Sequence, residues 1–73
     1  MNENELQDAL KTLLEELAFM DGDDRAEAGL PDELAAVKEV RTYREEGVLT
    51  QNAGLVITTA DGSEFQLTIV RSR

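Results

Sequence analysis

The stretch LVITTADGSEFQLTIV, residues 55–70, decides the fold of this chain. Two runs rich in β-branched and aromatic residues flank residues 60–63, which are the turn-forming sequence ADGS. β-branched and aromatic side chains favour strands, whereas Asp and Gly favour tight turns. The stretch therefore predicts an antiparallel β-hairpin with strands over about 53–60 and 63–71.

Two pairings of these strands compete, and they differ in which side chains share a face. A two-residue loop would pair Thr58 with Phe65 and would distribute the large apolar residues over both faces. A three-residue loop would pair Ile57 with Phe65, and it would place Gly62 in the left-handed conformation that glycine tolerates. We predict the second pairing, because it collects the large apolar residues on one face. That face would carry Ala53, Leu55, Ile57, Phe65, Leu67 and Ile69.

A second strong pattern lies near the amino-terminal end. Apolar residues recur there at intervals of three and four, which is the period of an α-helix with one apolar face. Asn2 or Asn4 can form a capping box with the Glu or Gln three residues later, and the sequence DGD at 21–23 is a stop, so the predicted helix spans about 4–20. We expect this helix to cover the apolar face of the hairpin. Its own apolar face comprises Leu6, Leu10, Leu13, Leu14, Leu17 and Met20.

The middle of the chain gives a weaker signal. Residues 21–29 are small or charged, which predicts a mobile connection. Pro31 suits the start of a second helix and Gly47 suits its end, which predicts a helix over about 31–46. The β-branched residues of 37–43 leave an alternative open, in which a short helix precedes a strand near 38–44. In both versions the fold class is α+β, and residues 1–73 form a single small domain.

Charge is distributed unevenly along the chain. Residues 1–33 contain 11 acidic and 2 basic residues, whereas residues 34–73 contain 5 of each, so the net charge of −9 belongs to the first part. Such a surface repels phosphate backbones and anionic lipids, and we expect no direct binding of nucleic acid or membrane. Acidic residues also simply aid solubility. The acidic amino-terminal end and the lack of a long apolar run lead us to expect a cytoplasmic protein.

The residue types argue against catalysis. The chain has no histidine and no cysteine, which excludes Ser-His-Asp and Cys-His nucleophiles, disulfides and the usual zinc sites. The acidic cluster from Asp21 to Glu27 fails as a calcium loop, because Arg25 and Ala26 stand where an EF-hand needs an oxygen ligand and a glycine. We therefore predict a protein that is not an enzyme and that needs no metal and no cofactor.

The small size of the core sets the functional expectation. A chain of 73 residues with three aromatic side chains and no disulfide buries little surface, and self-association is the compensation that remains. A hairpin edge that lacks a third strand would favour pairing with the same edge of another copy. We predict a protein–protein interaction module that forms a homodimer and binds another protein, and the acidic surface favours a basic partner. The alternative is an acidic, phage-type inhibitor that mimics nucleic acid and binds a basic nucleic-acid-binding protein.

The predicted partner-binding residues are two aromatic anchors and four acids. Phe19 lies off the apolar face of the first helix, so we expect it either to fold under a neighbour at a frayed helix end or to stay exposed as an anchor. Tyr43 is the second anchor. Electrostatic steering is assigned to Asp21, Asp23, Asp24 and Glu27.

Overall fold

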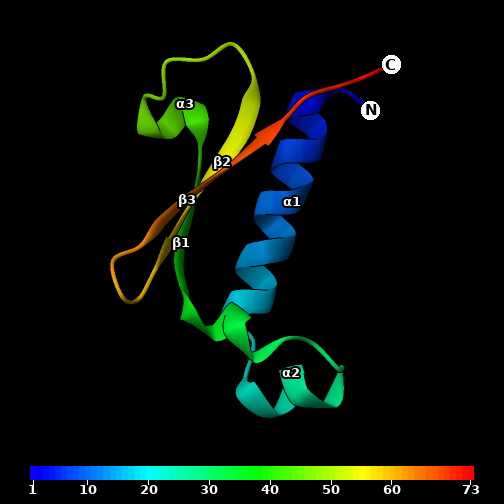
Figure 1. The fold of residues 1–73 in the computed structure, drawn as a ribbon. Helices are drawn as coiled ribbons and strands as arrows, with labels where there is room; N and C mark the ends of the chain where they lie inside the picture. Colours follow the sequence, from blue (N-terminus) through cyan, green and yellow to red (C-terminus); the bar gives the residue numbers. More distant parts are fainter.

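The computed structural model describes all 73 residues, and it places one long helix against a three-stranded antiparallel sheet (Figure 1). The sheet order is β1-β2-β3, so the strands lie side by side in chain order. The predicted α+β class is confirmed. No helix combines the length and the hydropathy that crossing a bilayer requires. The elements are α1 (Glu3–Ala18), α2 (Gly22–Glu27), the 3-10 helix η1 (Asp32–Ala36), β1 (Val37–Thr42), α3 (Tyr43–Glu46), β2 (Ala53–Thr59) and β3 (Glu64–Ile69).

Helix α1 begins as the sequence predicts and ends two residues early. The Asn2 side chain accepts the Glu5 backbone N–H at 2.8 Å, and the Glu5 carboxylate accepts the Asn2 N–H at 3.2 Å, which completes a capping box. The helix stops at Ala18, and Phe19 is its C-cap. The capping prediction is confirmed for the pair Asn2 and Glu5.

Arg25 anchors the segment that follows α1. Its Nη1 donates to the carbonyl oxygens of Leu17, Ala18 and Met20 at 3.2, 3.3 and 2.5 Å, and the residue is buried. The last carbonyls of a helix have no intrahelical partner and carry partial negative charge, so a buried cation satisfies them. The predicted connection over 21–29 contains the short helix α2, which this one side chain ties to the end of α1, and the mobility of the connection stays a prediction.

The hairpin has the predicted pairing. Leu55 lies opposite Leu67, and Ile57 lies opposite Phe65. Gly62 has a φ of 89°, which is the left-handed conformation expected in the three-residue loop. The Asp61 carboxylate accepts the backbone N–H of Ser63 at 2.9 Å, and this bond further fixes the turn.

The helix over 31–46 is wrong, and the alternative with a strand is confirmed. Only residues 32–36 form a short 3-10 helix, after which β1 pairs with β2 and a single helical turn follows. Val40 of β1 lies opposite Ile57 and is buried. A helix here would have put Arg41 and Arg44 in line with Leu34 and Val37, so the strand buries apolar surface that a helix would not.

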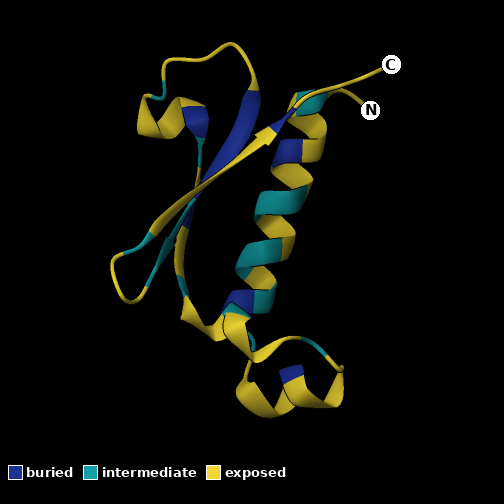
Figure 2. Ribbon diagram, viewed as in Figure 1, coloured by how far each residue is buried: buried dark blue, intermediate teal, exposed yellow.

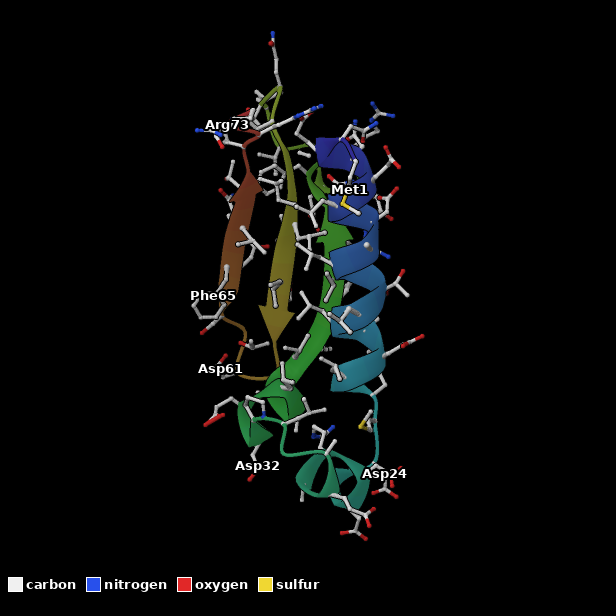
Figure 3. The ribbon with its side chains drawn as sticks, turned by 90° about the vertical axis from the view of Figure 1, so that its right-hand side faces the viewer. Met1, Asp24, Asp32, Asp61, Phe65 and Arg73 are labelled. Atoms are coloured by element: carbon white, nitrogen blue, oxygen red, sulfur yellow. The ribbon has the colours of Figure 1, made fainter.

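Helix α1 lies across β1 and β2 and leaves β3 uncovered (Figures 1 and 3). Figure 2 shows the consequence: the first half of β2 is buried, whereas β3 is exposed until its last residue. An α-helix is about 10 Å wide with its side chains. Three strands, each about 4.8 Å wide, span roughly 14 Å, so one helix covers about two strands. The predicted cover of the hairpin by α1 is confirmed for β2 and is wrong for β3, because β1 takes its place.

Tyr43 closes the opposite face of the sheet. Its hydroxyl lies 2.6 Å from Oγ1 of Thr68, and its ring packs over Gly54. A Cβ atom at position 54 would lie 2.3 Å from the ring and 2.6 Å from the Leu67 carbonyl oxygen. Glycine is therefore required at this position by the close approach of neighbouring atoms.

Candidate interaction surface

Strand β3 and the adjacent flank of α1 leave large apolar side chains uncovered on the same side of the molecule. Phe65 is 58% exposed and Leu67 is 42% exposed on the face of the sheet that carries α1. On the helix, Leu6 is 38% exposed and Leu13 is 49% exposed. We call Leu6, Leu13, Phe65 and Leu67 the β3-side apolar surface.

Helix geometry turns the two leucines towards β3. Leu6 and Leu13 are seven residues apart, which brings them within about 20° of each other around the helix. Leu6 lines a small cavity of about 130 Å³ together with Ile69 and Val70, at the end of β3. The leucines therefore overhang the strand that α1 does not cover.

The overhang arises because α1 does not dock through the middle of its leucine stripe. Its buried residues are Gln7 and Ala18, which lie to one side of that stripe. The Gln7 Oε1 atom accepts the backbone N–H of Gly54 at 3.0 Å, at a point where β1 has already ended. Gln7 thus replaces a missing strand partner, and the helix is rotated so that part of its apolar face stays exposed.

The outer edge of β3 carries unpaired backbone groups. In an antiparallel pair, successive residues direct their N–H and C=O groups alternately towards and away from the partner strand. The Thr59 N–H donates to the Ser63 carbonyl oxygen at 2.9 Å, while the Gly54 N–H points away from β3 to Gln7, and these two bonds fix the phase of the alternation. By this phase, the residues with outward backbone groups are Glu64, Gln66 and Thr68.

Opposite charges mark the two ends of this edge. Asp61 and Glu64 lie at the hairpin end, whereas Arg71 and Arg73 follow the strand at the other end (Figure 3). The hydrogen bond from the Thr59 hydroxyl, with further bonds from Ser63, lowers the pKa of the Asp61 carboxyl below its usual range. Asp61 is therefore ionised at neutral pH.

The six predicted partner-binding residues do not form one surface. Phe19 is 68% exposed at the junction of α1 and α2, so the expectation that it folds under a neighbour is wrong. Tyr43 is buried and packs inside the fold at the other end of the molecule (Figure 1). The remaining four are exposed around α2, and they are Asp21, Asp23, Asp24 and Glu27. The β3-side apolar surface was missed because its residues have the pattern of a core, and its signal is a leucine stripe wider than one helix can bury.

A cleft of about 750 Å³, lined mainly by polar residues, lies between the start of α1, α3 and the loop 47–52. Its titratable groups are Asp8, Arg44 and Glu45. The Thr42 backbone N–H donates to the Glu45 carboxylate at 2.9 Å, and this bond, with the Thr42 hydroxyl, lowers the pKa of Glu45. No group of three or more His, Cys, Asp or Glu side chains is placed to hold a metal ion.

No family model matches the chain, and no curated protein or solved structure is significantly similar to it. Evidence for function comes therefore from the surface itself. Of the surfaces described above, the β3 side alone combines a strand edge with exposed large apolar side chains.

Proposed function

We propose that the protein is a non-enzymatic interaction module that binds an extended segment of another polypeptide along β3. The observation that carries this proposal is that the open edge of β3 lies beside uncovered apolar side chains. A bound strand would exchange hydrogen bonds with the outward groups of Glu64, Gln66 and Thr68. Its alternate side chains would cover Phe65 and Leu67, so backbone bonds would supply affinity and side chains specificity.

Charge favours a partner segment that also carries basic residues. Ion pairs engage three of the 16 acidic residues, Glu15, Glu39 and Glu46, which leaves 13 unpaired. Glu16 follows Leu13 by three residues, so it borders the β3-side apolar surface within one helical turn. Negative potential beside an apolar surface raises the association rate of a positively charged segment.

The test is a pair of variants at the outward position 66. Gln66→Pro removes an outward N–H without removing a bond to β2, because proline is tolerated on the solvent side of an edge strand. Gln66→Ala is the matched control, since it changes the side chain and keeps the N–H. Each variant is titrated with extended peptides of alternating valine and lysine, and amide chemical shifts are recorded.

The expected result is that peptide binding shifts the amide signals of Glu64, Gln66 and Thr68 in the wild type and in Gln66→Ala. Binding to Gln66→Pro should weaken by about tenfold or more, because a lost hydrogen bond and a distorted edge together cost about 1.5 kcal/mol or more. Equal binding by the two variants, or shifts confined to another surface, would contradict the proposal.

A second candidate function is mimicry of nucleic acid. The observation that favours it is a set of exposed acids that continues from one helix to the next. A mimic would bind a basic groove mainly through charge, so its affinity should fall steeply between about 50 and 500 mM salt, whereas strand addition, which also relies on backbone hydrogen bonds and apolar contacts, should weaken less. Competition between this protein and duplex DNA for a basic protein, measured at the two salt concentrations, separates the candidates. The acids are Glu5, Asp8 and Glu16 on α1, and Asp23, Asp24 and Glu27 on α2.

A further inference from the structure

We infer that the strand bound by β3 is the β3 of a second copy, paired antiparallel with Gln66 on the two-fold axis. The inference rests on the proposed function, because it assigns a specific partner to the same edge. The two copies would form one continuous sheet of six strands, with both α1 helices on the same face. Each copy would present the same surface to the other, as a two-fold interface requires.

Backbone hydrogen bonding fits this register. With Gln66 opposite its own counterpart, Glu64 lies opposite Thr68 of the second copy. These are the three residues whose N–H and C=O groups point outward. Every outward group within the strand then meets a complementary group, which gives about six inter-strand hydrogen bonds.

The apolar side chains fit it as well. Phe65 lies opposite Leu67 of the second copy, on the face that carries α1. These are the two most exposed apolar side chains within β3. Residues directly opposite in an antiparallel pair have Cβ atoms about 5 Å apart, so each side chain covers the other. A register shifted by one residue would set this pair against the polar face instead.

Charge decides between the remaining arrangements. An antiparallel pairing brings the acidic hairpin end of one copy, with Asp61 and Glu64, towards the basic tail of the other, with Arg71 and Arg73. A parallel pairing would bring like charges together at both ends. Helix α1 carries five of the acids of residues 1–33 and contacts β1 and β2 (Figure 3), and among these acids Glu3 and Glu16 lie towards the β3 side.

Single introduced cysteines test the register, because the chain has none of its own. In the proposed pairing the two Cα atoms of Gln66→Cys lie about 5.5 Å apart, within disulfide range. Glu64→Cys is the matched control on the same edge and face, since the Cα atoms of its two cysteines would lie about 14 Å apart. Leu67→Cys tests the register shifted by two residues, in which the two copies of residue 67 would lie opposite each other.

The rate of covalent dimer formation is followed by non-reducing electrophoresis under mild oxidation. Paired thiols have an effective concentration in the millimolar range, so at about 100 µM protein Gln66→Cys should cross-link about tenfold faster than Glu64→Cys. Equal rates for the three variants would indicate random collision and would overturn the inference. The fastest rate for Leu67→Cys would overturn the register.

Molar mass separates this inference from the proposed function. At about 100 µM, light scattering should give the wild type about 16 kDa, twice the 8.1 kDa of one chain, and Gln66→Pro a mass near 8.1 kDa. A monomeric wild type that still binds peptides along β3 would overturn the inference and leave the proposed function standing. A monomer that binds no peptide at β3 would overturn both, and a dimer unaffected by Gln66→Pro would overturn the inference.

Discussion

The sheet has two edge strands, β1 and β3, which differ in how far they are protected against pairing with another strand. On β1 the pairing register shifts before Glu39, which marks a bulge. The Arg41 guanidinium forms ion pairs with Glu39 and Glu46 beside this edge. The N–H of Thr42 is occupied by the Glu45 carboxylate. Bulges, charges and occupied donors are the usual means by which proteins prevent edge-to-edge pairing.

Strand β3 has no bulge and no side chain that occupies its outward donors, and it carries a single charge. Its pairing with β2 is regular over its whole length, and its six residues include no proline, no lysine and one acid, Glu64. The protein thus protects one edge of a small sheet and leaves the other open. Because an unprotected edge is an aggregation hazard, the difference supports the proposal that β3 binds a partner.

The largest effect is expected from detaching β3 from the fold. Gly54→Ala would force a Cβ atom against the Tyr43 ring and the Leu67 carbonyl oxygen, and that backbone atom has little room to move. Overpacking of this kind costs about 3 kcal/mol, which lowers the melting temperature of a domain this size by more than about 10 °C. Thermal unfolding followed by circular dichroism measures it. Gly22→Ala is the control, because a Cβ atom there meets only ordinary contacts at 3.8 Å and should leave the melting temperature nearly unchanged.

The second effect comes from giving β3 the protection that β1 has. Leu67→Lys places a charge on the apolar face of the edge, and its desolvation on pairing should weaken the dimer by about 10- to 100-fold. The folded monomer should lose less than about 1 kcal/mol, because Leu67 is already partly exposed. Sedimentation equilibrium gives the dimer dissociation constant. Leu49→Lys, the same exchange at a fully exposed loop position, should leave it unchanged, and an equal loss there would point to net charge instead of the edge.

A third, smaller effect comes from removing protection at β1. The double variant Glu39→Thr with Arg41→Thr deletes the ion pairs of this edge and keeps the bulge and the occupied Thr42 N–H. A molecule with two open edges can form chains that do not close, so light scattering at about 100 µM should show masses above that of a dimer. A mass unchanged from wild type would mean that the bulge and the occupied Thr42 N–H are together sufficient protection.

The sequence predicts the hairpin register well because β3 alternates strictly between polar and apolar residues and a single glycine fits the turn. It predicts α1 because six apolar positions share one helical face. It does not decide between a strand and a helix for β1, because the short β-branched run there is interrupted by charges that suit a helix surface equally well. Nor does it predict the docking of α1 through Gln7 or the anchoring by Arg25, because single polar residues that satisfy backbone groups leave no periodic signal.

The candidate surface was harder to predict than the fold. Leu6, Leu13, Phe65 and Leu67 follow the pattern of core residues, and only the arrangement of the layers reveals that one helix cannot cover three strands. The charged residues chosen as steering groups lie on α2, at a distance along the molecule from β3 (Figure 1). Charge is easy to find in a sequence, whereas surplus apolar surface is visible only when its neighbours are known.

The smallest expected effect is a loss of stability at low pH, to which the two edge regions both contribute. Each edge region has one carboxyl with a lowered pKa: Glu45, held by the Thr42 N–H beside β1, and Asp61, held by the Thr59 hydroxyl in the turn before β3. A carboxyl whose folded pKa lies below its unfolded value stabilises the fold fully above that unfolded value, and the stabilisation is lost as the pH falls through the folded pKa. The unfolded values are about 4.3 for Glu and 3.9 for Asp, so the melting temperature should be nearly constant above about pH 5 and should fall below about pH 4. The variants Asp61→Asn and Glu45→Gln should each show a smaller decrease in melting temperature at low pH. Carbon-13 titration of the two carboxyls should give both midpoints below their unfolded values. A midpoint at the unfolded value would show that this carboxyl does not stabilise its edge region.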